Sequence, residues 1–81
     1  MLQVGQSEVF NTLRDRRIFG EDKFFSHAEI YNIMLSKDNS ISRNTLFKDL
    51  KKLHAWGYLE IRYTHKHTKH NKAYRVKEYY L

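Results

Sequence analysis

The sequence predicts an α+β fold in which three helices precede an antiparallel β-hairpin of two or three strands. Apolar residues recur at helical spacing in three segments before residue 57, and from residue 58 onward they alternate with polar residues as in a strand. The 81 residues are 41% hydrophobic and 15% aromatic, which provides for one hydrophobic core but not for two. We therefore expect a single domain that spans residues 1–81.

The first helix is predicted at about 7–17. Val9, Phe10 and Leu13 fall on one face of such a helix, and polar residues occupy the rest of its surface. Ser7 is a suitable N-cap, because its hydroxyl can accept a hydrogen bond from a backbone N–H of the first turn. The helix is short and amphipathic, as expected for one that packs against a core.

The second helix is predicted at about 27–36, where the local signals are strongest. The Ser26 hydroxyl and the Glu29 carboxylate can each accept the backbone N–H of the other residue, which forms a capping box. Phe25 can pack against Ile30 across this cap as a hydrophobic staple. Both features indicate a helix that begins directly after the cap.

After a polar turn at 37–40, a third helix is predicted at about 43–56. Its buried face consists of leucines at helical spacing, namely Leu46, Leu50 and Leu53. At 100° per residue these side chains fall within about 60° of one another. The opposite face combines small, polar and basic residues: Asn44, Lys48, Lys51 and Ala55. Gly57 is expected to end the helix, because glycine readily adopts the left-handed conformation of a C′ residue.

The hairpin is predicted at about 58–77. Apolar residues alternate with polar ones in its two strands: Leu59, Ile61 and Tyr63 in the first, Tyr74 and Val76 in the second. On this pattern Tyr63 and Tyr74 are buried and can pair across the hairpin. The connecting segment 64–72 contains no Asn-Gly or Asp-Gly pair, so we expect a loose loop there.

Positive charge is concentrated in the second half of the chain. Residues 1–41 contain five Lys and Arg against six Asp and Glu, whereas residues 42–81 contain ten against three, together with four of the five histidines. Within a net charge of +6, this asymmetry favours an acidic polymer as the partner, because each Lys or Arg that neutralises a phosphate releases a condensed counterion. An anionic membrane surface, or a charged face that only keeps the domain soluble, is the alternative.

Several classes of function are disfavoured by what the sequence lacks. Without cysteine there is no disulfide framework, thiolate metal site or thiol nucleophile. The glycines form no phosphate-binding loop and the acidic residues are scattered, so we expect neither an enzyme nor a bound cofactor. No apolar run has the ~18 residues of a membrane span, and the start of the chain shows no signal-peptide pattern. We expect a soluble, cytoplasmic protein that does not insert into a membrane.

The segment 40–62, SISRNTLFKDLKKLHAWGYLEIR, combines a polar start, a Leu-rich helix, the ending LKKL-x3-GYL and a strand. Together with the two preceding helices and the hairpin, it resembles the winged helix-turn-helix family of DNA-binding domains, as in small prokaryotic, archaeal or viral transcriptional regulators. The resemblance extends over nearly the whole chain. It implies that the third helix lies in the major groove of double-stranded DNA and that the hairpin, or wing, lies along an adjacent groove or the backbone. It also implies a regulator of transcription that acts by occupying a promoter or operator.

The first turn of the third helix holds the residues expected to reach base edges: Arg43, Asn44 and Thr45. Arg matches the O6 and N7 acceptors of guanine, and Asn matches N6 and N7 of adenine. Lysines on or beside the outward face are expected to contact phosphates and set the register: Lys48, Lys51 and Lys52. For any single lysine, the alternative is that it only solvates an exposed helix.

Lysines and histidines dominate the tip of the hairpin. Those expected to contact DNA are Lys66, His67, Lys69, His70 and Lys72. The lysines supply fixed charge, and the histidines add charge as the pH falls toward ~6.5. Metal binding by His65, His67 and His70 is an alternative that the neighbouring lysines oppose, and a solvated loop without a ligand is another.

Other aromatic residues are expected to pack in the core: Phe47, Trp56 and Tyr58. Phe47 could instead touch a thymine methyl. The predicted burial of Tyr63 and Tyr74 disfavours RNA or single-strand binding, which needs tyrosines on an open face for base stacking. A protein-interaction adaptor of the same fold is the main alternative to a DNA-binding regulator. We expect a monomer or weak homodimer, with dimerisation on DNA as an option.

Overall fold

The computed structural model describes residues 3–37 and 40–81, which form three helices and a three-stranded antiparallel sheet. The elements follow one another as α1 (Val4–Ile18), β1 (Phe25–Ser26), α2 (His27–Ser36), α3 (Arg43–Ala55), β2 (Glu60–His67) and β3 (Ala73–Tyr80). The α+β prediction is therefore confirmed. The predicted turn at 37–40 includes residues 38 and 39, which lie outside the described residues.

Helix α1 begins three residues before the predicted start. Gln3 is its N-cap, and the Gln6 side chain accepts the Gln3 backbone N–H at 3.3 Å. The predicted cap at Ser7 is wrong, because Ser7 lies inside the helix and its backbone N–H donates to the Gln3 carbonyl at 2.9 Å. The first turn contains mainly polar or small residues, so it adds nothing to the apolar periodicity that guided the prediction.

Helices α2 and α3 begin where the sequence predicts. Ser26 and Glu29 form the capping box, with each backbone N–H donating to the other side chain at 3.2 Å. Ser42 caps α3 by accepting the Thr45 backbone N–H at 3.1 Å. Gly57 ends α3 as expected, since its φ of 82° lies in the left-handed region that favours glycine.

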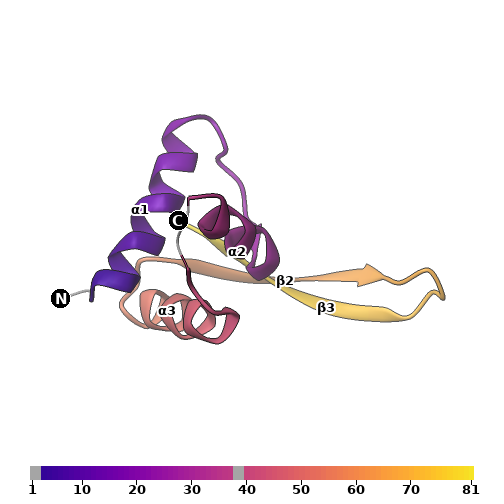
Figure 1. Cartoon of the computed structure of the whole chain (residues 1–81). Helices are drawn as coiled ribbons and strands as arrows, with labels where there is room; N and C mark the ends of the chain where they lie inside the picture. Colours follow the sequence, from indigo (N-terminus) through magenta and orange to yellow (C-terminus); the bar gives the residue numbers. More distant parts are fainter. Residues whose placement is uncertain (1–2, 38–39) are drawn as a thin grey trace.

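The sheet has the strand order β1-β3-β2, so the last strand of the chain is the central one. β2 and β3 pair from Glu60↔Tyr80 to His67↔Ala73, which makes the hairpin longer than predicted. Figure 1 shows the three helices gathered around one end of this hairpin, while its other end projects away from them. The tip is thus 68–72 rather than 64–72, and residues 78–80, which the prediction left after the hairpin, belong to β3.

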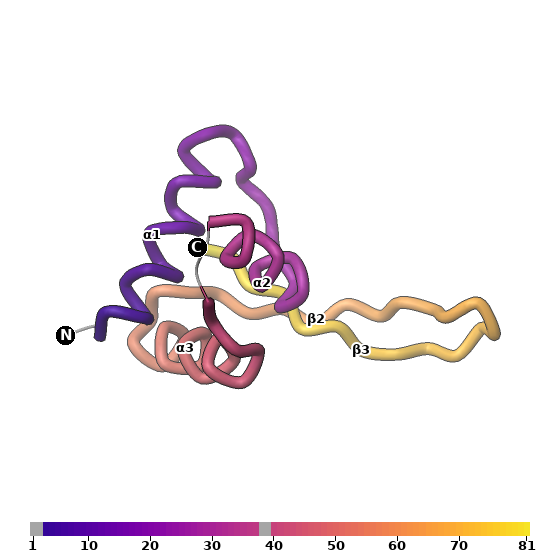
Figure 2. Tube along the Cα trace, in the orientation of Figure 1, coloured from indigo at the N-terminus to yellow at the C-terminus, as the bar shows by residue number. Residues whose placement is uncertain are grey.

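The tip has five residues, 68–72, so the expectation of several residues instead of a tight two-residue turn is confirmed, but the tip is hydrogen-bonded and not loose. The Thr68 backbone N–H donates to the Lys72 carbonyl at 3.0 Å, and the Thr68 carbonyl accepts the Asn71 N–H at 2.9 Å. Asn71 has a φ of 62°, which Asn tolerates better than most residues. Figure 2 traces the two strands from the helices to this turn.

The hydrophobic core lies where the helices cover the base of the hairpin. It contains Val9, Leu13, Phe25, Ile30, Met34, Leu46, Leu50, Leu53, Leu59 and Tyr79. The three leucines of α3 have no exposed surface, which confirms the predicted buried face. Tyr79 is 1% exposed and pairs with Phe25 of β1, so the C-terminal aromatic segment completes the core.

Several aromatic residues predicted to be buried are exposed. The exposed fractions are 47% for Phe47, 59% for Trp56, 45% for Tyr58, 52% for Tyr63 and 46% for Tyr74. Tyr63 of β2 and Tyr74 of β3 are not part of the hydrophobic core. They do not pair with each other, because Tyr63 is opposite Lys77 and Tyr74 is opposite Lys66.

None of the helices in the described part of the chain combines the length and hydropathy that a membrane span requires.

Candidate nucleic-acid interface

The outward face of α3 is exposed and basic, as the buried leucines require. Asn44, Lys48, Lys51 and Lys52 are all exposed. The one acidic residue of α3, Asp49, faces α1 instead: a Cβ added to Gly5 of α1 would lie 3.2 Å from its Oδ2. Burial raises the pKa of Asp49, whose Oδ2 has no hydrogen-bond partner in the described residues. The outward face therefore holds lysines without an acid beside them.

The three predicted base-contacting residues differ in what they already contact. The Thr45 hydroxyl accepts a hydrogen bond from the Ser42 hydroxyl at 2.8 Å, so it belongs to the helix cap. The Arg43 guanidinium lies 5.0 Å from the centre of the Tyr31 ring, which draws it toward α2. Asn44 is exposed, and its side chain makes no hydrogen bond within the described ranges. Asn44 is therefore the residue of this turn most available to a ligand.

The hairpin has two faces, which we define by its register. Paired residues share a face and successive residues alternate, so one face, the inner face, contains Ile61, Tyr63, His65, His67, Ala73, Arg75, Lys77 and Tyr79. Tyr79 of this face is in the core, and Ile61 packs against it. Lys66 and Tyr74 lie on the opposite face. Lys66 and His67, both placed in the tip by the sequence prediction, are thus strand residues that point to opposite sides.

A cleft separates α3 from the inner face of the hairpin. It has a volume of about 500 Å³ and is lined by Phe47, Lys51, His54, Ile61, Tyr63 and Lys77. We call it the helix–hairpin cleft. Lys51 connects the two surfaces, because it is exposed on the outward side of α3 and also lines the cleft. The outward face of α3 therefore adjoins the helix–hairpin cleft at Lys51.

A second cleft of about 590 Å³ lies between the start of α2 and the hairpin, and it shares Phe47 and Lys77 with the first. Its lining includes His27, whose Nε2 lies 3.1 Å from the Arg43 carbonyl oxygen and so joins α2 to the start of α3. Arg75 and Tyr74 line its far side. No acidic side chain of residues 3–37 or 40–81 lines either cleft.

Cations stack on aromatic rings along the inner face. The Lys77 Nζ lies 5.3 Å from the centre of the Phe47 ring and 5.6 Å from that of Tyr79. The Arg75 guanidinium lies 4.5 Å from the centre of the Tyr63 ring. These contacts hold the cations in place without neutralising them.

Sequence reasoning did not select Arg75, Lys77 or Tyr63 as site residues. The alternating pattern shows which of these residues share a face of a strand, but it does not show which face adjoins α3. The missing information is the register, which follows from the length of the tip.

The predicted tip residues Lys69, His70 and Lys72 are exposed at the far end of the hairpin. No three His, Cys, Asp or Glu side chains of the described residues come together in a way that could hold a metal ion. The three histidines considered as metal ligands are spread over β2 and the turn, with His65 and His67 on the inner face and His70 in the tip.

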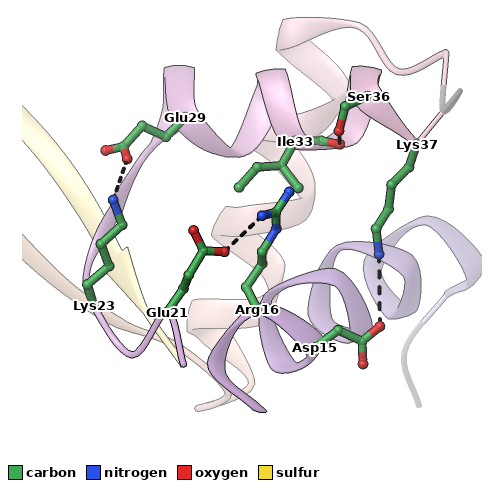
Figure 3. Close-up of polar contacts among 8 residues, drawn as sticks. All are labelled: Asp15, Arg16, Glu21, Lys23, Glu29, Ile33, Ser36 and Lys37. Carbon is green, nitrogen blue, oxygen red and sulfur yellow. Dashed lines mark hydrogen bonds and ion pairs between the residues drawn. The ribbon is translucent and has the colours of Figure 1, made fainter. Parts of the chain in front are cut away.

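Four of the five Lys and Arg residues in the first 37 positions lie in ion pairs, in contrast to these lysines. Figure 3 shows Arg16 with Glu21 at 2.8 Å, Lys23 with Glu29 at 3.1 Å and Lys37 with Asp15 at 3.9 Å. Burial alone raises the pKa of Glu29, but hydrogen bonds from Ser26 and Lys23 outweigh it and lower the pKa overall.

Comparison of the chain with protein-family models, with curated proteins and with solved structures finds no match.

Proposed function

We propose that the protein is a winged helix-turn-helix domain that binds double-stranded DNA with sequence preference and regulates transcription by occupying a promoter or operator. In this proposal α3 enters the major groove, and the inner face and tip of the hairpin follow the adjacent backbone or groove. The supporting observation is the exposed lysines of α3 together with the two clefts beside it, which are lined by basic and no acidic side chains among the described residues.

Each part of this surface has a distinct role in the proposed complex. Asn44 and Arg43 at the start of α3 read base edges, and Thr45 holds the helix cap that orients them. Lys48, Lys51 and Lys52 contact phosphates beside the major groove. The tip residues Lys69, His70 and Lys72 extend the contact along the backbone, with Lys66 and His67 on the two sides of the hairpin. No catalytic step and no cofactor are required, and a monomer or weak homodimer suffices.

The main experiment is selection of bound sequences from a random duplex pool. We expect a short motif to be enriched, since Asn and Arg at the start of a recognition helix discriminate between bases. A symmetric motif would indicate dimeric binding. Binding without any enriched motif would contradict the assignment of α3 as a sequence reader.

The variant Asn44→Ala tests the role of the first turn. It should cost about 1–3 kcal/mol at one base pair of the selected motif and should leave affinity for random duplex nearly unchanged. Lys69→Ala is the control for a phosphate contact: it should weaken binding to both duplexes alike and reduce the salt slope by about one unit. Equal losses on both duplexes for Asn44→Ala would refute base reading by this residue.

A protein-interaction adaptor is the second candidate, because two large apolar side chains at the end of α1 are exposed. Ile18 is 69% and Phe19 84% exposed, and Phe19 lines a shallow pocket with Asp15, Arg16 and Lys37. An adaptor would bind its partner with little dependence on salt, whereas DNA binding should weaken steeply with salt. A salt titration of the complex distinguishes the two.

A further inference from the structure

Exposed aromatic rings surround the two clefts beside α3. Phe47 lines both clefts, Tyr63 lines the helix–hairpin cleft, and Tyr74 lines the second one. Each ring is about half exposed. Apolar rings gathered in a concave, basic surface indicate a ligand that covers them.

The lining of the helix–hairpin cleft fits one class of ligand. Phe47, Ile61 and Tyr63 supply apolar and aromatic surface, while Lys51 and Lys77 supply positive charge and no acid is present. A ligand that matches both has a flat aromatic part and a negative charge. A nucleotide combines these two features, because its base stacks on aromatic rings and its phosphate pairs with lysine.

Base pairing limits which nucleotide can use this cleft. In a duplex both faces of every base are covered by neighbouring bases, so a protein reaches only the base edges in the grooves. The face of a base becomes available to a tyrosine ring only when the nucleotide is unpaired or turned out of the stack. The cleft therefore suits an unpaired nucleotide and not a base pair.

We propose that the helix–hairpin cleft binds one unpaired nucleotide of a DNA whose adjoining duplex lies on α3. This inference rests on the proposed function, which supplies DNA as the partner. Tyr63 and Phe47 provide ring surface for the base, and the cations that lie over these two rings, Arg75 and Lys77, provide charge for its phosphate. Lys51 faces both the cleft and the outward side of α3, so the paired and unpaired parts of the DNA meet at this residue.

Affinity for two matched DNAs tests the proposal. One is a blunt duplex that contains the selected motif, and the other is the same duplex with a three-nucleotide bulge at its edge. Stacking of one base should make the wild-type protein bind the bulged DNA about 10-fold more tightly. Fluorescence anisotropy at a fixed salt concentration measures both dissociation constants.

Variants of Tyr63 separate stacking from general binding. Tyr63→Ala should remove most of the preference for the bulge, measured as the ratio of the two dissociation constants, whereas Tyr63→Phe retains the ring and should retain this ratio. Trp56→Ala is the matched control, because Trp56 is 59% exposed but lines neither cleft. Loss of the preference in Trp56→Ala as well would overturn the assignment to this cleft.

A fluorescent base in the bulge gives a second measurement that needs no variant. 2-Aminopurine at the unpaired position should be quenched when the wild-type protein stacks a ring on it. Equal affinity for the two DNAs together with unchanged 2-aminopurine fluorescence would overturn the inference, while tight binding of the blunt duplex would leave the proposed function intact. Failure to bind either DNA would overturn both.

Discussion

Lysines and arginines make different contacts in two regions of the molecule, one formed by α1 and the following loop and the other by α3 and the hairpin. On the side of α1 and the following loop, Arg16, Arg17, Lys23 and Lys37 each lie within 4 Å of a carboxylate oxygen. On α3 and the hairpin, Lys48, Lys51, Lys52, Lys66, Lys69 and Lys72 have no acidic partner among the described residues. Paired cations connect neighbouring segments of the fold, and unpaired ones leave their charge available to a phosphate.

The uneven charge along the sequence thus becomes an uneven distribution in space. Arg62 is the exception on the hairpin, since its Nε lies 2.9 Å from the Glu78 carboxylate. Arg75 and Lys77 are intermediate, because they contact aromatic rings instead of acids. Four sets of substitutions test whether paired and unpaired charges have these different roles.

The largest effect is expected from removing unpaired charge. The double variant Lys48→Gln with Lys51→Gln should weaken duplex binding about 10- to 100-fold and reduce the salt slope by about two units, since two phosphate contacts are lost. The control Lys23→Gln with Lys37→Gln removes the same charge from the paired side and should change affinity by less than about 2-fold. Equal losses in the two variants would show that only net charge matters. A salt series of anisotropy titrations measures both.

The pair of Arg62 and Glu78 is expected to affect stability and not DNA binding. Glu78 has a side chain that is 9% exposed, so Glu78→Gln weakens a charge-assisted hydrogen bond at a nearly buried position and should cost about 1–2 kcal/mol. Urea unfolding measures this loss. Glu60→Gln, at an exposed position of the same strand pair, is the control and should stay within about 0.5 kcal/mol. A similar loss of unfolding free energy in Glu78→Gln and Glu60→Gln would contradict a specific stabilising role of the Arg62–Glu78 pair.

Asp49 is the reverse case, an acidic residue of α3 that has no ion pair with a described Lys or Arg. Its raised pKa means that the folded state binds the proton more tightly than the unfolded chain, so ionisation at neutral pH opposes folding. Asp49→Asn should therefore stabilise the protein at pH 7, by an amount on the order of 0.5 kcal/mol. The gain should shrink as the pH falls through the raised pKa toward the ordinary value of 3.8. Thermal unfolding at several pH values measures it, and a gain independent of pH would contradict this cause.

The smallest effect is expected for an exposed ion pair on the paired side. Glu21→Gln breaks the pair with Arg16, in which both side chains are more than a third exposed, and should cost about 0.2–0.5 kcal/mol. This cost should vanish in 1 M salt. Although the variant is more positive by one charge, its affinity for DNA should not rise, since the freed arginine lies away from α3. Tighter binding would contradict the separation of the two sides.

Features that depend on nearby residues could be predicted from the sequence. The capping box of Ser26 and Glu29, the leucine stripe of α3 and the end of that helix at Gly57 each follow from residues within a few positions of one another. The outward lysines of α3 follow directly from the leucines. These features were enough to predict the order of the main elements and the part of the candidate interface that lies on α3.

Features that depend on distant pairing could not be predicted in the same way. β1 has only two residues, and they form a strand because Phe25 and Ser26 lie opposite Tyr79 and Glu78 of β3. The alternation in the hairpin is correct, but it does not reveal that the helices cover only the base. Tyr63 therefore has the spacing of a core residue while lying beyond the core.

In the proposed complex, the projecting hairpin also sets how far the protein extends along the DNA. The molecule measures 42 Å in its longest dimension and 26 Å in the other two. A strand advances ~3.4 Å per residue, which is close to the rise of one base pair in DNA. Evolution could lengthen or shorten the hairpin in steps of two residues per strand, because such a step keeps each residue on its face of the sheet. Each step would change the length of duplex that the proposed complex covers by about two base pairs, and the three helices would stay as they are.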